Sequence, residues 1–170
     1  AKRSGVFGLF FSGIPSFYMS SALEEKWKNR FPIDKDSWEA KYPGVDPAVT
    51  LSTGPVYGDW RYFVCREGGY DGNVVNARIA KFTKSNFNPI FDDTDIVLYR
   101  YAGMILLLAE AENQLGNTNK SLELVNQVRA ARKLPLVTLA EFGATIDERE
   151  NYILDERQFE LLGEGKRWWD

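Results

Sequence analysis

The sequence contains no histidine among its 170 residues. Histidine is the commonest general base in enzymes and the commonest zinc ligand in proteins, so histidine-based triads and metal centres are excluded. The single cysteine, Cys65, has no partner for an internal disulfide and cannot build a cysteine metal cage. We interpret Cys65 as a small buried hydrophobic residue rather than a reactive thiol.

The sequence also lacks long apolar runs and any strong excess of one charge. No stretch reaches the ~18 consecutive apolar residues of a membrane-spanning helix. Lys and Arg number 21 against 24 Asp and Glu, a net charge of −3, and no long block of one sign occurs. This balance does not support nucleic-acid binding, which usually needs a concentrated cationic face. Glycine-rich nucleotide motifs and G-x-S-x-G are absent too, so we expect no cofactor and no metal.

The opening segment, residues 2–19, has basic residues before a short apolar run, as a signal peptide does. Gly8, Gly13 and Pro15 interrupt that run, and no clear cleavage site follows. We therefore expect a buried strand or loop here, with a short strand at Val6–Phe11.

The strongest pattern in the chain is a helical hairpin from Tyr101 to about Arg132. Apolar residues recur at helical spacing along one face of its first helix: Tyr101, Met104, Ile105, Leu108, Ala111 and Leu115. Ala102, Leu106 and Ala109 fill much of another face, so the helix must be buried on more than one side. Gly116 is placed to end the first helix, and Asn117 or Thr118 to cap the second.

A third helix is predicted from Thr145 to Leu162. Thr145 and Glu148 have the spacing of a capping box, and Gly163 follows the helix. The predicted fold class is mainly α: a helical hairpin plus a third helix over residues 95–170, and a loop-rich, aromatic region over 1–94 with short strands. We expect residues 1–170 to form a single domain or a fragment of one.

Turn-forming residues dominate the first 94 positions. Ser20 or Ser21 is expected to cap a short helix over Ala22–Lys28, and Phe31–Pro55 is predicted to be an ordered surface excursion. Tyr57–Arg66 and Val74–Phe82 have strand-like composition and could pair as a hairpin. Thr83–Thr94 is expected to be a polar loop.

Charged residues of the third helix form the main candidate polar cluster. Glu156 and Glu160 lie four apart on one face and repel each other unless cations cover them. Arg100, Arg129 or Arg132 could supply those cations. We favour a structural ionic network over a catalytic acid–base pair of the glycoside-hydrolase kind. The network residues are Arg100, Asn126, Arg129, Glu156, Arg157 and Glu160.

Two smaller groups of residues could bind ligands. Asp92, Asp93 and Asp95 could hold calcium, but they lack the spacing of an EF-hand, and we interpret them as a turn and helix cap. Aromatic residues make up 14% of the chain, and flat rings serve both cores and sugar platforms. The candidate ligand-binding residues are Trp38, Tyr42, Trp27 and Trp60. Core packing is the alternative for each, and Trp38 and Tyr42 are favoured because they lie in the turn-rich excursion.

Several segments of the helical region form a recognisable series. In order, they are Arg100-Tyr101 leading into LLLAEAENQLGN, then LVNQVRAAR at 124–132, DERQFEL at 155–161 and GKRWWD at 165–170. Together they resemble the SusD/RagB family of nutrient-binding outer-membrane lipoproteins. Gly58-Asp59-Trp60-Arg61 resembles a further turn that precedes these segments in the family. The close resemblance covers about 70 residues.

The resemblance implies a mostly helical protein with tetratricopeptide-like helix pairs. It also implies non-enzymatic capture of glycans or other nutrients at the cell surface, for delivery to a TonB-dependent, SusC-like transporter. The localisation implied is the outer membrane, through a lipid anchor outside this chain. Family members are longer, so we expect a C-terminal fragment. The alternatives are a helical-repeat adaptor that binds another protein and, more remotely, a glycoside hydrolase.

Overall fold

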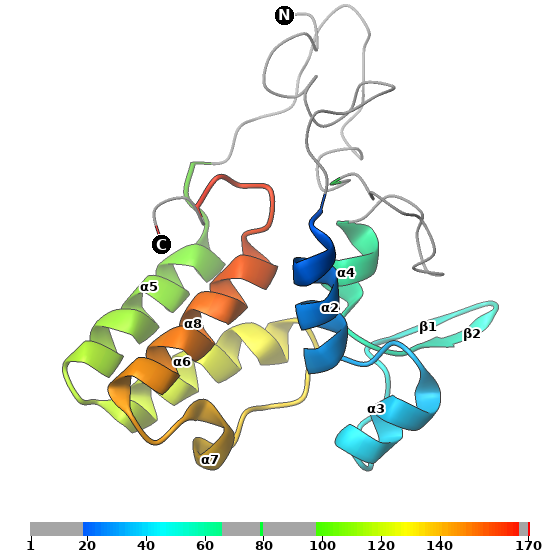
Figure 1. Cartoon of the computed structure of the whole chain (residues 1–170), viewed down its shortest axis with the longest axis horizontal. Helices are drawn as coiled ribbons and strands as arrows, with labels where there is room; N and C mark the ends of the chain where they lie inside the picture. Colours follow the sequence, from blue (N-terminus) through cyan, green and yellow to red (C-terminus); the bar gives the residue numbers. More distant parts are fainter. Residues whose placement is uncertain (1–18, 66–78, 80–97, 167–169) are drawn as a thin grey trace, which may run out of the picture. The chain divides into compact units, whose positions relative to one another are not determined.

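The computed structural model describes residues 19–65, 79, 98–166 and 170. The chain separates into two compact units, shown in Figure 1. Unit 1 comprises residues 1–43 and 49–96, and unit 2 comprises 44–48 and 97–170. The described residues are mostly helical, which confirms the mainly α fold class. That the two units form a single domain stays a prediction.

The first described helices of unit 1 are α2, Ser21–Arg30, and α3, Lys35–Lys41. The Ser20 hydroxyl accepts a hydrogen bond from the Leu23 amide at 3.2 Å, so the predicted serine cap and short helix are confirmed. Asp34 caps α3 in the same way, through the Ser37 amide at 2.8 Å. A helix therefore lies within the excursion that turn-forming residues predicted.

The rest of the described unit 1 consists of a short hairpin and a short helix. Strands β1, Val49–Leu51, and β2, Gly54–Val56, pair antiparallel with Val49 opposite Val56. Helix α4, Trp60–Val64, follows. The prediction of a strand over Tyr57–Arg66 is thus wrong. Its aromatic, β-branched composition is overridden by Asp59, whose side chain caps the helix by accepting the Arg61 amide at 2.9 Å.

Unit 2 is built on the predicted hairpin, which is confirmed as α5, Tyr101–Gln114, and α6, Thr118–Ala131. Gly116 makes the turn with a φ of 80°, a conformation that glycine adopts without steric cost. Asn117 occupies the N-cap position of α6, but its side chain makes no capping hydrogen bond. The position of the cap was predicted correctly, and its usual bond is absent.

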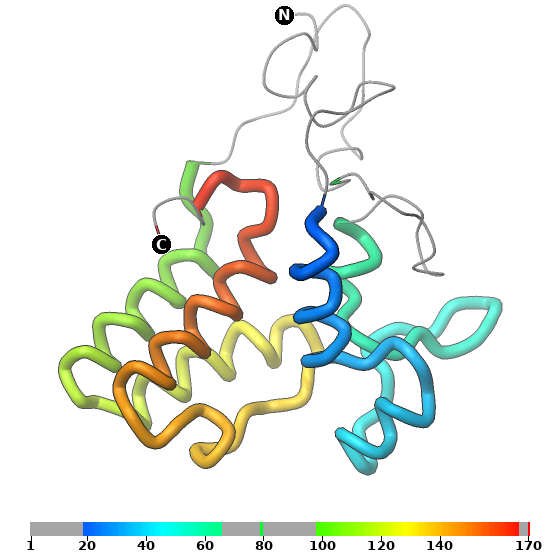
Figure 2. The backbone as a smooth tube through the Cα atoms, in the orientation of Figure 1, coloured from blue at the N-terminus to red at the C-terminus, as the bar shows by residue number. Residues whose placement is uncertain are grey.

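The third predicted helix is α8, Ile146–Glu160, and it begins with the predicted capping box. Thr145 accepts the Glu148 amide at 3.2 Å, and the Glu148 carboxylate accepts the Thr145 amide at 3.0 Å. A short helix that we did not predict, α7, Leu139–Phe142, precedes it and carries a second capping box at Thr138. Figure 2 traces α5, α6 and α8, and α5 packs against both of the others.

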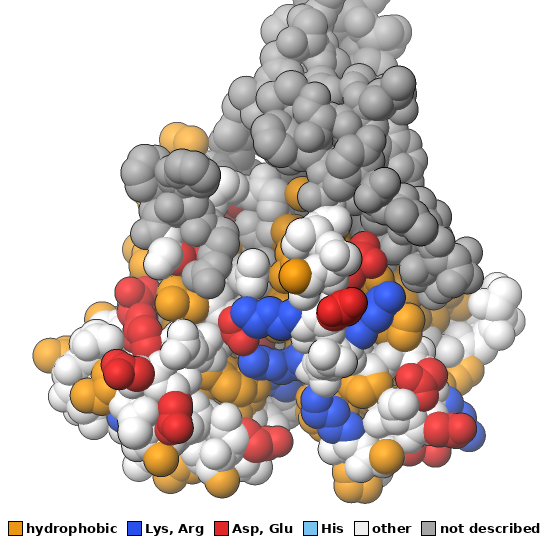
Figure 3. All heavy atoms as spheres, in the orientation of Figure 1, with side chains coloured by type: hydrophobic (Ala, Val, Ile, Leu, Met, Phe, Trp, Pro, Cys, Tyr) orange, Lys and Arg blue, Asp and Glu red, His pale blue; other side chains and the backbone are white. Residues whose placement is uncertain are grey.

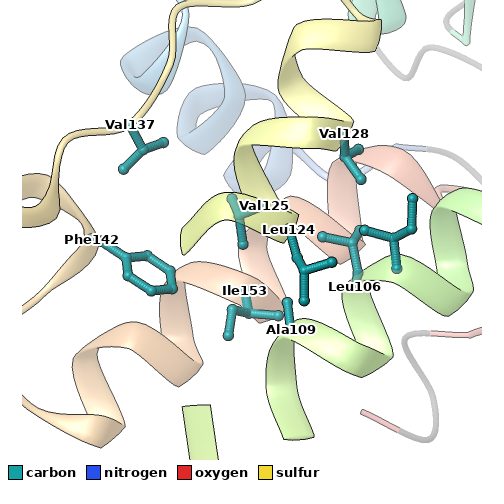
Figure 4. Packing of buried hydrophobic residues seen from close by; sticks show 9 residues of the cluster. Leu106, Ala109, Leu124, Val125, Val128, Val137, Phe142 and Ile153 are labelled. Atoms are coloured by element: carbon teal, nitrogen blue, oxygen red, sulfur yellow. The ribbon is translucent and has the colours of Figure 1, made fainter. Parts of the chain in front are cut away.

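The core of unit 2 lies between these helices, as Figure 4 shows. Its buried residues are Ile105, Leu106, Ala109, Leu124, Val125, Val128, Val137, Phe142 and Ile153. The buried side of α5 is therefore the one that carries Leu106 and Ala109. Most of the stripe that helical spacing selected is exposed, with Tyr101 at 74% and Leu115 at 74%. On the face drawn in Figure 3, apolar side chains and charges of both signs are interspersed.

Several predicted elements lie outside the described residues. They are the strand at Val6–Phe11, most of the strand at Val74–Phe82, and the loop at Thr83–Thr94 with its aspartates. The predicted pairing of the second strand with Tyr57–Arg66 fails in any case, because Trp60–Val64 is helical.

Candidate functional site

A buried carboxylate organises the aromatic part of unit 1. Asp59 is 1% exposed, and its Oδ2 accepts the Trp27 indole N–H at 2.8 Å. The Arg61 guanidinium lies on the same carboxylate, with Nη2 2.7 Å from Oδ2. Gly58, with a φ of 97°, brings the turn against the backbone carbonyls of Phe31 and Pro32. The Gly58–Arg61 motif is thus an architectural device that fastens α4 to α2.

The four candidate ligand-binding aromatics all lie in unit 1, and their exposure divides them. Trp27 is 1% exposed and Trp38 is fully buried, so both rings belong to the core of the unit. Tyr42 and Trp60 are half-buried and keep part of each ring at the surface. Only these last two can present a ring to a ligand in the described arrangement.

Tyr42 is held in place on several sides. Its hydroxyl donates to the Arg30 carbonyl at 2.7 Å, and its ring lies 5.0 Å from Trp38 and 6.4 Å from Phe31, centroid to centroid. The Lys41 ammonium lies 5.7 Å from the centroid of the same ring. A ring fixed this way loses little conformational entropy when it binds a ligand. The Trp60 ring lies 6.2 Å from the ring of Phe63, centroid to centroid.

Glu160, in unit 2, lies between two arginines. Arg100 Nη1 is 2.6 Å and Arg132 Nη2 is 2.5 Å from its Oε1, and Arg100 also donates to the Glu160 carbonyl. Arg100 Nε binds Glu164 at 2.9 Å. Burial by itself would lower the pKa of Arg100, but its hydrogen bonds to Glu164 and Glu160 outweigh burial and raise that pKa. Glu160 is thus neutralised by cations from α6 and from the start of α5.

Glu156 lies deeper than Glu160 and faces Arg129. Glu156 is fully buried and Arg129 is 2% exposed, with 3.5 Å between Oε2 and Nη1. Arg129 also donates to the Pro135 carbonyl at 2.7 Å and to the Tyr152 hydroxyl at 2.8 Å. Both glutamates are inaccessible to a substrate and covered by arginines, which supports the structural interpretation over the catalytic one.

The other two predicted network residues have separate partners. Asn126 exchanges two hydrogen bonds with the Val137 backbone, at 2.9 and 2.7 Å, and so fixes the connection that follows α6. Arg157 binds the Asp170 carboxylate at 2.5 Å.

Sequence reasoning missed several buried polar residues, and two of them, Asn113 and Arg149, are partners in unit 2. Asn113 and Arg149 bind each other, with Nε 2.8 Å from Oδ1. A signal for them was present, because Asn113 follows Ala109 by four residues and Arg149 precedes Ile153 by four. Polar residues on a buried helical stripe must find partners.

The described residues contain neither a cluster of metal-binding side chains nor a membrane-spanning helix. No three His, Cys, Asp or Glu side chains of ranges 19–65 and 98–166 gather as a metal site would require. The aspartates of the 92–95 cluster lie outside those ranges. Among the helices that the structure describes, none has the length and apolar content needed to cross a membrane.

Comparison with known proteins identifies the chain's relatives. The model of the SusD family matches residues 48–170. The chain belongs to the SusD family. SusD-like protein P38 of Formosa agariphila is 44% identical over 99% of this chain and 36% of its own length. SusD-like protein P2 of the same organism is 30% identical over 86% of this chain and 31% of its own length.

The family match extends beyond the helical motifs. It begins at residue 48, and so includes the Gly58–Arg61 turn as well as α5, α6 and α8 of this SusD-family chain. The chain spans about a third of the length of the two curated relatives. No solved structure matches it.

Proposed function

We propose that this SusD-family protein binds glycans or other nutrients at the cell surface without transforming them. In the proposal it is a lipid-anchored outer-membrane protein that passes its ligand to a TonB-dependent, SusC-like transporter. Family membership is the observation that carries the proposal. The burial and arginine pairing of Glu156 and Glu160 support a non-enzymatic role.

Tyr42 and Trp60 are the proposed ligand contacts in the described part of unit 1. The apolar face of a sugar ring can stack on an aromatic ring, and each of these two rings is partly accessible. The Trp38 ring packs against Tyr42, and the Trp27 indole donates to the carboxylate of Asp59, the residue before Trp60. In this arrangement the two buried tryptophans act by positioning the two accessible rings.

Affinity electrophoresis against a panel of polysaccharides tests the proposal. Tyr42→Ala and Trp60→Ala should each weaken binding of the retarding glycan by about two- to tenfold, the range expected for one aromatic contact. Tyr42→Phe keeps the ring and should bind nearly normally. Tyr101→Ala, at a tyrosine that is 74% exposed in α5, is a matched control and should have no effect.

Two results would favour the alternatives. If no glycan retards the protein while a peptide or another protein binds tightly, it is an adaptor; the exposed apolar side chains of α5 are the feature that suits that role. If Glu156→Gln abolishes a measured sugar-cleaving activity and leaves the melting temperature unchanged, the hydrolase interpretation is revived.

A further inference from the structure

A cleft of about 1180 Å³ lies entirely within unit 2. It opens where the α5–α6 turn, α7 and the start of α8 meet, and Figure 1 shows that turn and the first residues of α8 at the same end of the helices. Its charged lining residues are Arg149, Lys120 and Glu112. Neither Tyr42 nor Trp60 lines this cleft, so the proposed glycan binding does not account for it.

Arg149 brings a buried positive charge to this cleft. The residue is 7% exposed, and its described hydrogen-bond partners are all neutral: Asn113 Oδ1 at 2.8 Å, and the carbonyls of Gly143 and Ala144 at 3.2 and 2.9 Å. These bonds occupy Nε and Nη1. In the described part of the chain nothing accepts a hydrogen from Nη2.

The guanidinium of Arg149 therefore keeps donor capacity at Nη2 that no described residue uses. Arg149 is one of the residues that line the cleft. The neighbouring Glu148 carboxylate attracts Arg149, but its Oε2 already accepts the amides of Ala144 and Thr145. A positive charge removed from water favours a bound counter-anion.

The first turn of α6 lines the same cleft and supplies further donors. Asn117 makes no side-chain capping hydrogen bond to this helix, and its amide Nδ2 donates to Glu112 Oε2 at 2.7 Å. Among the described residues, no acceptor lies on the backbone N–H groups of Asn119 and Lys120. Uncapped N–H groups and the helix dipole favour an anion at such an end.

We propose that this cleft binds an oxyanion, a carboxylate or a sulfate group. Arg149 Nη2 and the first-turn amides of α6 are the donors. Lys120 also lines the cleft, and its ammonium pairs with Glu123 at 2.9 Å. The Glu112 carboxylate, which lines the cleft too, accepts a hydrogen bond from the Asn117 side chain. The oxyanion is either a free ion or a substituent on a saccharide. A free ion would bind whether or not the protein captures glycans, so the two proposals can fail separately.

Calorimetric titration of the full chain with sulfate at constant ionic strength tests the proposal. Asn119→Asp places a carboxylate in the first turn of α6, where it competes with the anion and does not weaken the helix. This variant and Arg149→Gln should each weaken sulfate binding about tenfold or more. Asn151→Asp makes the same charge change on exposed α8 surface outside the cleft and should stay within about twofold.

Thermal melts accompany each titration. If Arg149→Gln does not fold, Asn119→Asp alone decides the question. Titrations with acetate, glucuronate and glucose distinguish the sources. Tighter binding of glucuronate than of acetate, with none of glucose, assigns the oxyanion to an acidic sugar. Equal binding of glucuronate and acetate assigns it to a free ion. The proposal is overturned if sulfate does not bind, or if it binds folded Asn119→Asp as well as the wild type.

Discussion

At the scale of single residues, the carboxylates of unit 2 differ in their partners and their burial. Glu160 has two arginine partners, Glu156 faces one buried arginine, and Glu148 caps a helix at the surface. Burial raises the pKa of Glu110, and repulsion by the nearby Glu150 carboxylate raises it further. Stability therefore depends on partners more than on the number of charges.

Removing the cation from the buried pair should be costly. Arg129→Ala leaves Glu156 buried without its arginine and should lower the free energy of unfolding by about 3–5 kcal/mol. Urea denaturation measures the change. Lys120→Ala, which removes an exposed pair with Glu123, is the control and should change stability by less than about 1 kcal/mol. A loss below about 1 kcal/mol for Arg129→Ala would place its charge in contact with water instead.

Glu148 and Glu110 should have opposite effects on the pH dependence of stability. Amide hydrogen bonds from Thr145 and Ala144 lower the pKa of Glu148 below 4.5, so its stabilising contribution is present at neutral pH and lost as pH falls through that lowered pKa. Burial and Glu150 raise the pKa of Glu110 above 4.5, so its ionisation destabilises the fold as pH rises through the raised value.

The matching variants test these signs. At pH 7, Glu148→Gln should lower the melting temperature and Glu110→Gln should raise it. Both differences should shrink toward zero as pH falls well below 4.5, because the wild-type side chains then become protonated. Differences of the same sign, or differences independent of pH, would contradict the assignment.

At the scale of elements, the junction between α7 and α8 is sterically constrained at Gly143. Gly143 has a φ of 123°, and a Cβ there would lie 2.6 Å from the Cβ of Glu148. Its carbonyl accepts from Arg149, and Thr145 caps the next helix. The same turn therefore holds the N-terminus of α8 and the guanidinium of Arg149 in place.

Replacing this glycine should be far more harmful than replacing one inside a helix. Gly143→Ala forces a steric clash as well as a strained backbone, and should cost more than about 2 kcal/mol of unfolding free energy. Gly103→Ala is the matched control. It lies within α5, where the added Cβ meets Leu161 at an ordinary 3.6 Å, and it should be neutral or stabilising by up to about 1 kcal/mol. Equal effects in chemical denaturation would refute the clash.

Elements were predictable where local signals act. Ser20, Gly116 and the Thr145 capping box set helix ends through bonds to residues within four positions, so the helix ends could be read from the sequence. The strand predicted over Tyr57–Arg66 failed because composition is a weak guide when one carboxylate, Asp59, caps a helix. Helix α3 was not predicted, because the turn-forming residues on both sides of this short helix dominate the composition of the segment.

At the scale of the whole molecule, the candidate sites belong to different units. The aromatic residues proposed for glycan contact are in unit 1, and the oxyanion cleft is in unit 2. The family match from residue 48 to residue 170 takes in parts of both. Glycan electrophoresis and sulfate titration therefore examine separate parts of one SusD-family chain.

The sequence by itself determined the family, the mainly α character and the ends of the long helices. These follow from order, spacing and short-range hydrogen bonds along the chain. It also led to Arg100, Arg129 and Arg132 as cations for Glu156 and Glu160, because two acids on one helical face need cover.

Only the tertiary structure decided which rings and charges reach the surface. All four candidate aromatics look alike in sequence, yet residues distant in the chain bury Trp27 and Trp38; Asp59 and Tyr62, for example, contact Trp27. In the same way, α5 is apolar on several sides, and only packing against α6 and α8 selected Leu106 and Ala109 as its core face. The cleft at Arg149 likewise joins residues from α6, α7 and α8. Burial depends on elements distant in the chain, and no local pattern records it.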